Sequence, residues 1–246
     1  MDFRGARNLL IAPIFVFMAS GICPENPDTP SPAALTAAQV VDQMQRLNQV
    51  RNEKLKHLRS IRHYMAEYRG FSTTVAAQME VEYTYDAASG KTFRIVTQSG
   101  SKFLLEKVLK RAVDSEKEAS QDKAATALTA ANYKFNLAGS ESLAGRPAYI
   151  LDVEPKGASK FLYRGKVWVD AAEFALVKID AEPAKNPSFW IARTLIRQSF
   201  AKTGDFWLPQ ENRSETKVRV GGNAVFAIDY GTYRIESSRM EPKGGH

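Results

Sequence analysis

The chain has 246 residues, of which 44% are hydrophobic and 25% are charged, so one large domain or two small ones can build a core. A formal net charge of +7 is mild, and without a helix-turn-helix, zinc-finger or RNP pattern it gives no support to nucleic-acid binding. Lys and Arg are densest between Arg51 and Arg62, where a solvated helix face is favoured over attraction to anionic lipid headgroups.

The first 21 residues have the organisation of a signal peptide. Arg4 and Arg7 precede the apolar run of residues 9–19, and the small residues Ala19 and Gly21 suit signal peptidase, with cleavage before Ile22. The run is short for a membrane span and contains a proline. The sequence therefore predicts export to the periplasm.

Cys23 is the only cysteine, so no internal disulfide can form. Its position just after the apolar run would suit a lipid-modified cysteine. Lipid anchoring there is possible but not favoured, because that modification needs a small preceding residue and Ile22 stands there.

Residues 22–34 are rich in proline and predict an extended linker, and we expect a single domain over residues 35–246. Residues 35 to about 58 predict a helix that Thr36 caps and whose inner face carries Val40, Met44 and Leu47. No glycine or proline marks where this helix gives way to a strand near Ser60.

Residues 75–85 alternate between apolar and largely polar side chains, which predicts a strand with one buried face. A turn over residues 86–91 follows, and Phe93, Ile95 and Thr97 are expected to continue the apolar face on the return strand.

Residues 103–133 contain strong helix formers without glycine or proline and predict one long helix or a helical hairpin. Its apolar stripe comprises Phe103, Leu104, Val108, Leu109, Ala112 and Val113. Strands resume afterwards, with long strands at residues 189–202 and 206–220 and a last strand at residues 224–236.

This order predicts an α+β fold that is mostly antiparallel β: a curved sheet of about ten strands covered by helices. The concave apolar face of such a sheet is either filled by the protein's own side chains or left open as a cavity for a ligand.

The sequence offers few catalytic groups. His57 and His63 are six residues apart, without the spacing of a metal pair on a helix, and no nucleophile elbow, P-loop or dinucleotide motif occurs. We therefore predict no catalytic residues, no metal, no cofactor and no enzymatic activity. An enzyme acting on lipids or glycans is the least favoured class.

The second half of the chain resembles a known family through its strand and hairpin motifs. They are the runs at 165–170 (GKVWVD), 177–179 (VKI), 204–209 (GDFWLP) and 228–230 (IDY), followed by Tyr233. With the order of elements before them, these motifs resemble the LolA/LolB-like superfamily, and more narrowly the bacterial outer-membrane lipoprotein-sorting proteins. The resemblance implies a half-open β-barrel around helices, with a hydrophobic cavity that takes acyl chains in the periplasm.

The leading functional prediction is non-enzymatic binding or transport of lipid or lipoprotein acyl chains. The alternative is an envelope sensor or protein-interaction module of the same fold with a filled cavity, and transient contact with a membrane surface fits either. The side chains expected to face the cavity are Val81, Tyr83, Phe93, Ile95, Leu151, Phe161, Tyr163, Val177, Ile179 and Phe226.

Overall fold

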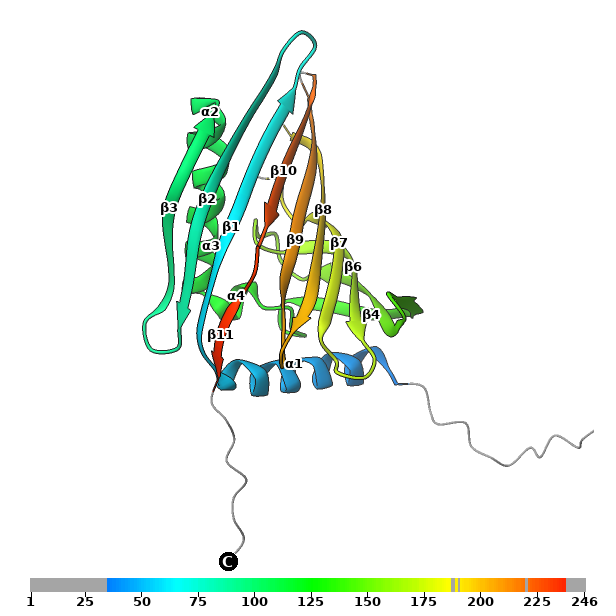
Figure 1. Ribbon diagram of the computed structural model, residues 1–246. Helices are drawn as coiled ribbons and strands as arrows, with labels where there is room; N and C mark the ends of the chain where they lie inside the picture. The colour runs from blue at the N-terminus through cyan, green and yellow to red at the C-terminus, as the bar shows by residue number, and fades with distance from the viewer. Residues whose placement is uncertain (1–34, 187–188, 190, 220, 238–246) are drawn as a thin grey trace, which may run out of the picture. The chain divides into compact units, whose positions relative to one another are not determined.

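The computed structural model describes residues 35–186, 189, 191–219 and 221–237. Eleven strands form one antiparallel sheet, in which the order is β3-β2-β1-β10-β9-β8-β7-β6-β5-β4 and β11 pairs with β1. The sheet does not close, because β3 and β4 stand at its two ends, and the predicted open half-barrel is confirmed (Figure 1). The strands are β1 Leu55–Arg69, β2 Thr74–Asp86, β3 Gly90–Gly100, β4 Tyr133–Leu143, β5 Arg146–Pro155, β6 Tyr163–Asp170, β7 Leu176–Pro183, β8 Ile191–Thr203, β9 Phe206–Val218, β10 Asn223–Asp229 and β11 Arg234–Ser237.

The helices lie in two places on this sheet (Figure 1). Helix α1 (Ala37–Lys54) runs across one end of the strands. The predicted helical insertion is a nearly continuous rod behind β1, β2 and β3, made of α2 (Lys102–Leu104), the π-helical turn η1 (Leu105–Leu109) and α3 (Lys110–Gln121), with the short α4 (Lys123–Thr126) after it. Among the described residues, no helix is both long and apolar enough to span a bilayer.

Helix α1 begins as predicted and ends earlier. The Thr36 side chain accepts a hydrogen bond from the Gln39 backbone, and the Gln39 side chain accepts from the Thr36 backbone, which is a complete capping box. The helix stops at Lys54, and β1 starts at Leu55. The predicted helical end near residue 58 is therefore wrong, because the strand alternation after Leu55 is hidden in the sequence by polar residues on its buried face.

Strands β2 and β3 form the predicted hairpin, with one difference of register. Tyr83 pairs with Phe93 and Val81 with Ile95 as expected. A bulge next to Val81 then places Thr97 opposite Glu80, whose carboxylate accepts the Thr97 hydroxyl hydrogen bond at 3.2 Å. The expectation that Thr97 continues the apolar face is wrong, because one extra residue in β3 reverses the side on which the following side chains lie.

The core consists of two separate clusters. Helix α1 buries Val40, Val41 and Met44 against β4 to β7, around Leu151 and Val167. The rod of η1 and α3 buries a second set against β1, β2 and β10: Leu104, Leu105, Leu109 and Val113 against Tyr64, Ala66, Ala77, Met79, Val81, Ile228 and Tyr230. Of the predicted helical stripe, Phe103 instead lies exposed. The concave face of the sheet is thus covered at both ends by different helices.

The last predicted strand is two strands. β10 ends at Asp229 and β11 begins at Arg234, so the prediction of one strand over residues 224–236 is wrong. Gly231 turns the chain with φ +62°, and its N–H donates to the Asp229 carboxylate at 2.8 Å. A Cβ at Gly231 would lie 2.2 Å from the Ile61 carbonyl oxygen, so this break allows a close approach to β1 that only glycine permits.

The turn between β6 and β7 ties several strands together through two carboxylates. Asp170 is buried and accepts hydrogen bonds from Arg146 at 2.7 Å and from the Glu173 backbone at 2.7 Å. The Glu173 carboxylate accepts hydrogen bonds from the Lys202 ammonium at 2.8 Å and from the Trp207 indole N–H at 2.9 Å. Burial acts to raise the pKa of each carboxyl, but these donors outweigh it, and both pKa values lie below their ordinary range.

We expect Asp170→Asn to lower the free energy of unfolding at neutral pH by about 1.5 kcal/mol, because a charge-assisted hydrogen bond is lost. The pKa of Asp170 is lower in the folded protein than in the unfolded chain, where it is near 3.8. The Asp170 carboxylate therefore stabilises the fold at pH values above the unfolded-state pKa, and this contribution is lost as the pH falls through the folded-state pKa. Thermal unfolding measured from neutral pH down to about pH 3 should therefore show the gap between wild type and variant narrowing in acid. Asp152→Asn, at a half-exposed pair with Lys166, is the control; a gap that is equal for both variants or independent of pH would contradict the prediction.

Candidate ligand-binding cavity

A cavity of about 530 Å³ lies beside the core cluster that packs under η1 and α3, and Tyr230 and Tyr233 belong to both. It opens where the end of α1, the start of β1, α3 and the segment between β10 and β11 approach one another. Its volume falls in the range of about 300–1,000 Å³ that is usual for small-ligand sites. The lining residues are Asn52, Leu55, Leu58, Arg62, Tyr83, Tyr85, Lys91, Glu116, Lys123, Gln198, Leu208, Pro209, Tyr230 and Tyr233.

Arg62 is the most unusual side chain in this wall, because it is a cation inside the fold. Buried and exposed residues alternate along β1, and Arg62 is at a buried position on the side covered by α3. Its side chain is only 4% exposed. The guanidinium carbon lies 3.5 Å from the centre of the Tyr83 ring and 4.8 Å from that of Tyr230. This stacking is a cation–π arrangement that partly replaces water around the charge.

Glu116 on α3 is the counter-ion of Arg62. Its carboxylate accepts a hydrogen bond from Arg62 at 2.8 Å and lies 3.4 Å from the Lys91 ammonium on β3. Burial acts to lower the pKa of Arg62, but the Glu116 charge raises it, and the net pKa is raised, so the guanidinium stays charged. Glu116 thus links α3 to two strands across the cavity.

The tyrosines around the charge pair remain protonated at any physiological pH. Burial raises the pKa of Tyr83 to about 12, although the nearby Arg62 acts to lower it. Burial also raises the pKa of Tyr230 and Tyr233. The Tyr233 hydroxyl donates to the Pro209 carbonyl at 2.6 Å and fixes the segment after β10 over β9. The wall therefore offers aromatic surface, aliphatic surface and one paired cation.

Of the residues predicted to face a cavity, one lines this cavity, and most of the others pack in the two clusters or lie outside both. Tyr83 lines the cavity, with Phe93 against its ring at 5.3 Å between centroids. Val81, Leu151 and Ile179 are buried in the clusters beneath the helices. Phe226 packs partly buried against one cluster and Tyr163 against the other, while Phe161 and Val177 are half-buried and Ile95 is 40% exposed. That these side chains contact a ligand stays a prediction.

Sequence reasoning did not identify Arg62 or Glu116 as parts of a site. The prediction of a solvated helix face over residues 51–62 is wrong for Arg62, which lies buried on β1. The signal available was the alternation Leu58, Ser60, Arg62, Tyr64, Ala66, which places a cation at an inward position once a strand is assumed. Glu116 gave no such signal, because it stands in a run of charged helix residues.

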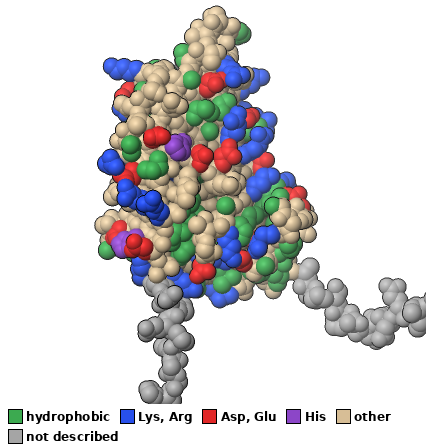
Figure 2. Space-filling view, viewed as in Figure 1, with side chains coloured by type: hydrophobic (Ala, Val, Ile, Leu, Met, Phe, Trp, Pro, Cys, Tyr) green, Lys and Arg blue, Asp and Glu red, His purple; other side chains and the backbone are tan. Residues whose placement is uncertain are grey.

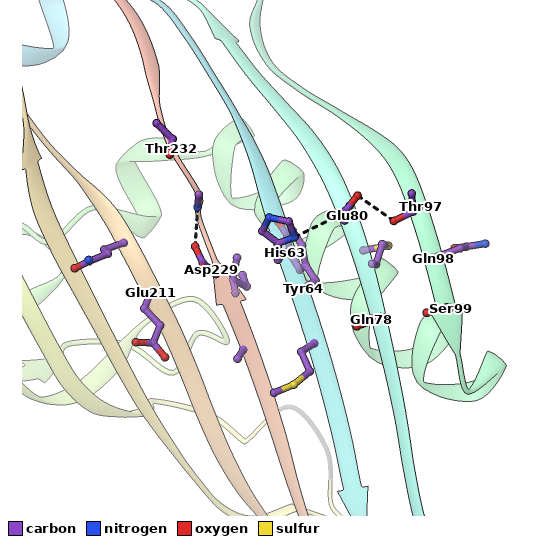
Figure 3. A pocket seen from close by; sticks show the side chains of 16 residues that line it. His63, Tyr64, Gln78, Glu80, Thr97, Gln98, Ser99, Glu211, Asp229 and Thr232 are labelled. Carbon is purple, nitrogen blue, oxygen red and sulfur yellow. Dashed lines mark hydrogen bonds and ion pairs between the residues drawn. The ribbon is translucent and has the colours of Figure 1, made fainter.

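A second, larger hollow of about 940 Å³ lies on the opposite, outer face of the sheet (Figure 3). His63 forms an ion pair there with Glu80 at 3.3 Å, beside Asp229 and Glu211 on β10 and β9. These side chains are largely exposed, on a face where charges of both signs alternate with apolar groups (Figure 2). We therefore take the concave cavity, with its buried charge, as the candidate site.

His57 pairs with Asp86 at 2.8 Å and His63 with Glu80, and both side chains are more than half exposed. Within the described ranges, no group of three or more His, Cys, Asp or Glu side chains is placed to hold a metal ion.

A family model covers more than half of the chain. Residues 38–186 match the family model described as the MucB/RseB N-terminal domain. A search of curated proteins finds no match.

Three solved structures illustrate the range of similar proteins. A DUF1329 family protein from Desulfovibrio piger is 14% identical, with 81% of this chain and 93% of that chain covered and a TM-score of 0.43. A LolA superfamily protein from Nitrosomonas europaea is 12% identical, with coverage of 84% and 96% and a TM-score of 0.35. A MucA/MucB complex from Pseudomonas aeruginosa matches at 14% identity, 80% and 100% coverage and a TM-score of 0.27. The predicted resemblance to the LolA/LolB-like superfamily is confirmed for the fold.

Proposed function

The chain belongs to the MucB/RseB N-terminal domain family, and we propose that it binds the acyl part of a lipid or lipoprotein in the periplasm, without catalysing a reaction. The observation that carries the proposal is the cavity at the end of α1, lined by β1, α3 and the segment between β10 and β11. Leu55, Leu58 and Leu208 supply aliphatic surface there, and the tyrosines supply aromatic surface. Apolar burial needs no further motif, since each CH₂ group taken out of water contributes about 0.8 kcal/mol.

The periplasmic part of the proposal rests on the predicted signal peptide and on the family. Residues 1–34, which hold the signal peptide, Cys23 and the proline-rich linker, lie outside the described residues. Mass spectrometry of the mature N-terminus tests this part: we expect cleavage before Ile22 and an unmodified Cys23. A diacylglyceryl adduct on Cys23 would contradict this expectation and show that the protein is anchored to a membrane by a lipid.

We expect Leu208→Trp to weaken binding of a fluorescent fatty acid by about tenfold or more. The larger ring would occupy space in the cavity, and excluding roughly two CH₂ groups of a ligand already costs about 1.6 kcal/mol. The measurement is a fluorescence titration of the full chain after removal of co-purified lipid, together with native mass spectrometry of the untreated protein to identify that lipid.

The matched control is Leu195→Trp. Leu195 pairs with Glu215 on the outer face of β8 and lines a hollow away from the cavity, so its variant should bind within about twofold of wild type. Absence of uptake by the wild-type protein, or equal weakening by both variants, would contradict acyl binding in this cavity.

A protein partner is the second candidate, and the free edge of the sheet favours it. Strand β3 ends the sheet, and no described strand pairs with its outer side. Its residues Ile95 and Val96 are 40% and 44% exposed, and residues 95–99 carry no charge. Such an edge can accept an extended peptide as an added strand. An Ile95→Lys variant that loses a partner while keeping fatty-acid uptake would show that the two activities are separate.

A further inference from the structure

Three polar atoms on the inner face of β1 are buried without a hydrogen-bond partner among the described residues. They are the Ser60 hydroxyl oxygen, Arg62 Nε and the Tyr64 hydroxyl oxygen. They belong to alternate residues of one strand, so all three side chains lie on the side that faces the cavity and α3. A buried polar group without a partner is costly, and three in succession are unusual in a native core.

Arg62 is the member of this group that also lines the cavity. A guanidinium has five N–H donors in a planar fork, and here Glu116 is the acceptor that the described part of the chain supplies. The Tyr83 and Tyr230 rings stack on the guanidinium, and its Nε has no hydrogen-bond partner among the described residues, so this permanently charged group keeps an unpartnered donor in the wall of the cavity.

The charges around the cavity favour an anion. Arg62, Lys91 and Lys123 are three cations against the single carboxylate of Glu116 among the described lining residues. Lys91 shares that carboxylate with Arg62, so Glu116 neutralises neither completely. The aliphatic and aromatic wall beside the charges suits an apolar group attached to the anion.

We infer that this cavity takes an amphiphile with a carboxylate or phosphate group, and that the oxyanion is bound inside the fold by Arg62. The inference rests on the proposed acyl-binding function, and it adds the chemistry of the ligand's headgroup and the orientation of the ligand in the cavity. The oxyanion accepts a hydrogen bond from the Arg62 guanidinium in competition with the Glu116 carboxylate. The alkyl chain lies against Leu58, Leu208 and the tyrosines.

The test compares probes that share one dodecyl chain: dodecanoate, dodecyl phosphate and uncharged dodecanol. Each displaces a neutral fluorescent dye from the full-length, lipid-stripped protein. We expect both anions to bind about tenfold or more tightly than dodecanol, which is the size of effect of one charge-assisted hydrogen bond. Inorganic phosphate alone should not displace the dye. If it binds as tightly as dodecyl phosphate, the site binds a free anion, and the assignment of an amphiphilic ligand is overturned.

Substitutions at the charge pair should act in opposite directions. Arg62→Gln should bring the ratio of anion affinity to dodecanol affinity down to about one, and Arg62→Lys should keep part of the preference for anions. Glu116→Gln removes the competing carboxylate and should tighten binding of the anions by several-fold. The controls are Arg59→Gln, whose exposed side chain pairs with the largely buried Glu82, and Glu118→Gln, at an exposed pair with Lys160.

The outcomes separate this inference from the proposed function. If no probe binds the wild-type protein, both fail. If dodecanol binds as tightly as the anions, acyl binding stands and the headgroup assignment is overturned. An Arg62→Gln variant that loses dodecanol and anions equally, while circular dichroism shows a native fold, would assign Arg62 a structural role only.

Discussion

Leu151→Ala should lower the free energy of unfolding by about 3 kcal/mol. Leu151 is fully buried in the cluster beneath α1, and removing buried methyl groups costs the lost transfer free energy together with that of the cavity left behind. Leu109→Ala, at a fully buried position of the other cluster, should cost a similar amount. Urea denaturation followed by both tryptophan fluorescence and circular dichroism measures the two effects.

These two variants also test whether the walls of the cavity unfold together. The two clusters pack on one continuous sheet, so we expect one transition whose midpoint falls equally by both probes. Val50→Ala, at an exposed position of α1, is the control and should stay within about 0.5 kcal/mol of wild type. If Leu109→Ala produces a separate early transition, the rod of η1 and α3 detaches on its own.

Gly165→Ala should destabilise the protein by about 3 kcal/mol or more. Gly165 on β6 has φ +147°, and a Cβ there would lie 2.4 Å from the Asp180 carbonyl oxygen and 2.7 Å from Ala181 Cα on β7. Both are backbone atoms of the paired strand, so the clash cannot be relieved by a side-chain rotation. Thermal and urea unfolding of the variant measure the cost.

Gly139 provides the matched comparison. It has nearly the same backbone conformation, with φ +145°, but no atom within 4 Å of the position of a Cβ. Gly139→Ala therefore carries the conformational cost alone, and the difference between the two variants isolates the close approach of β6 to β7. Equal destabilisation of both variants would show that the contact with β7 contributes nothing.

Local sequence patterns identified the elements whose signals are complete within a few residues. The alternation over residues 75–85 specified the buried face of β2, and Thr36 marked the start of α1. The apolar stripe around Leu109 and Val113 identified the helix that packs on that face. The same signals gave the half-barrel fold class, because a long antiparallel run with two helical segments has few other arrangements.

The sequence did not reveal the boundary of β1, because Ser60 and Arg62 interrupt its apolar alternation. That strand is defined by pairing with β2 on one side and β10 on the other, including Tyr64 opposite Ile228. Local propensity contains no information about a partner so distant along the chain. The same limit explains the break at Gly231, which is set by the close approach of Ile61.

The sequence by itself determined that this chain forms a curved antiparallel sheet with an apolar face and two helical segments to cover it. Only the tertiary structure decided that the two segments cover different ends of that face, and that Arg62 on β1 meets Glu116 on α3. The reason is physical: hydrophobic periodicity specifies which side of an element is buried, whereas the partner of a buried charge depends on how distant elements pack.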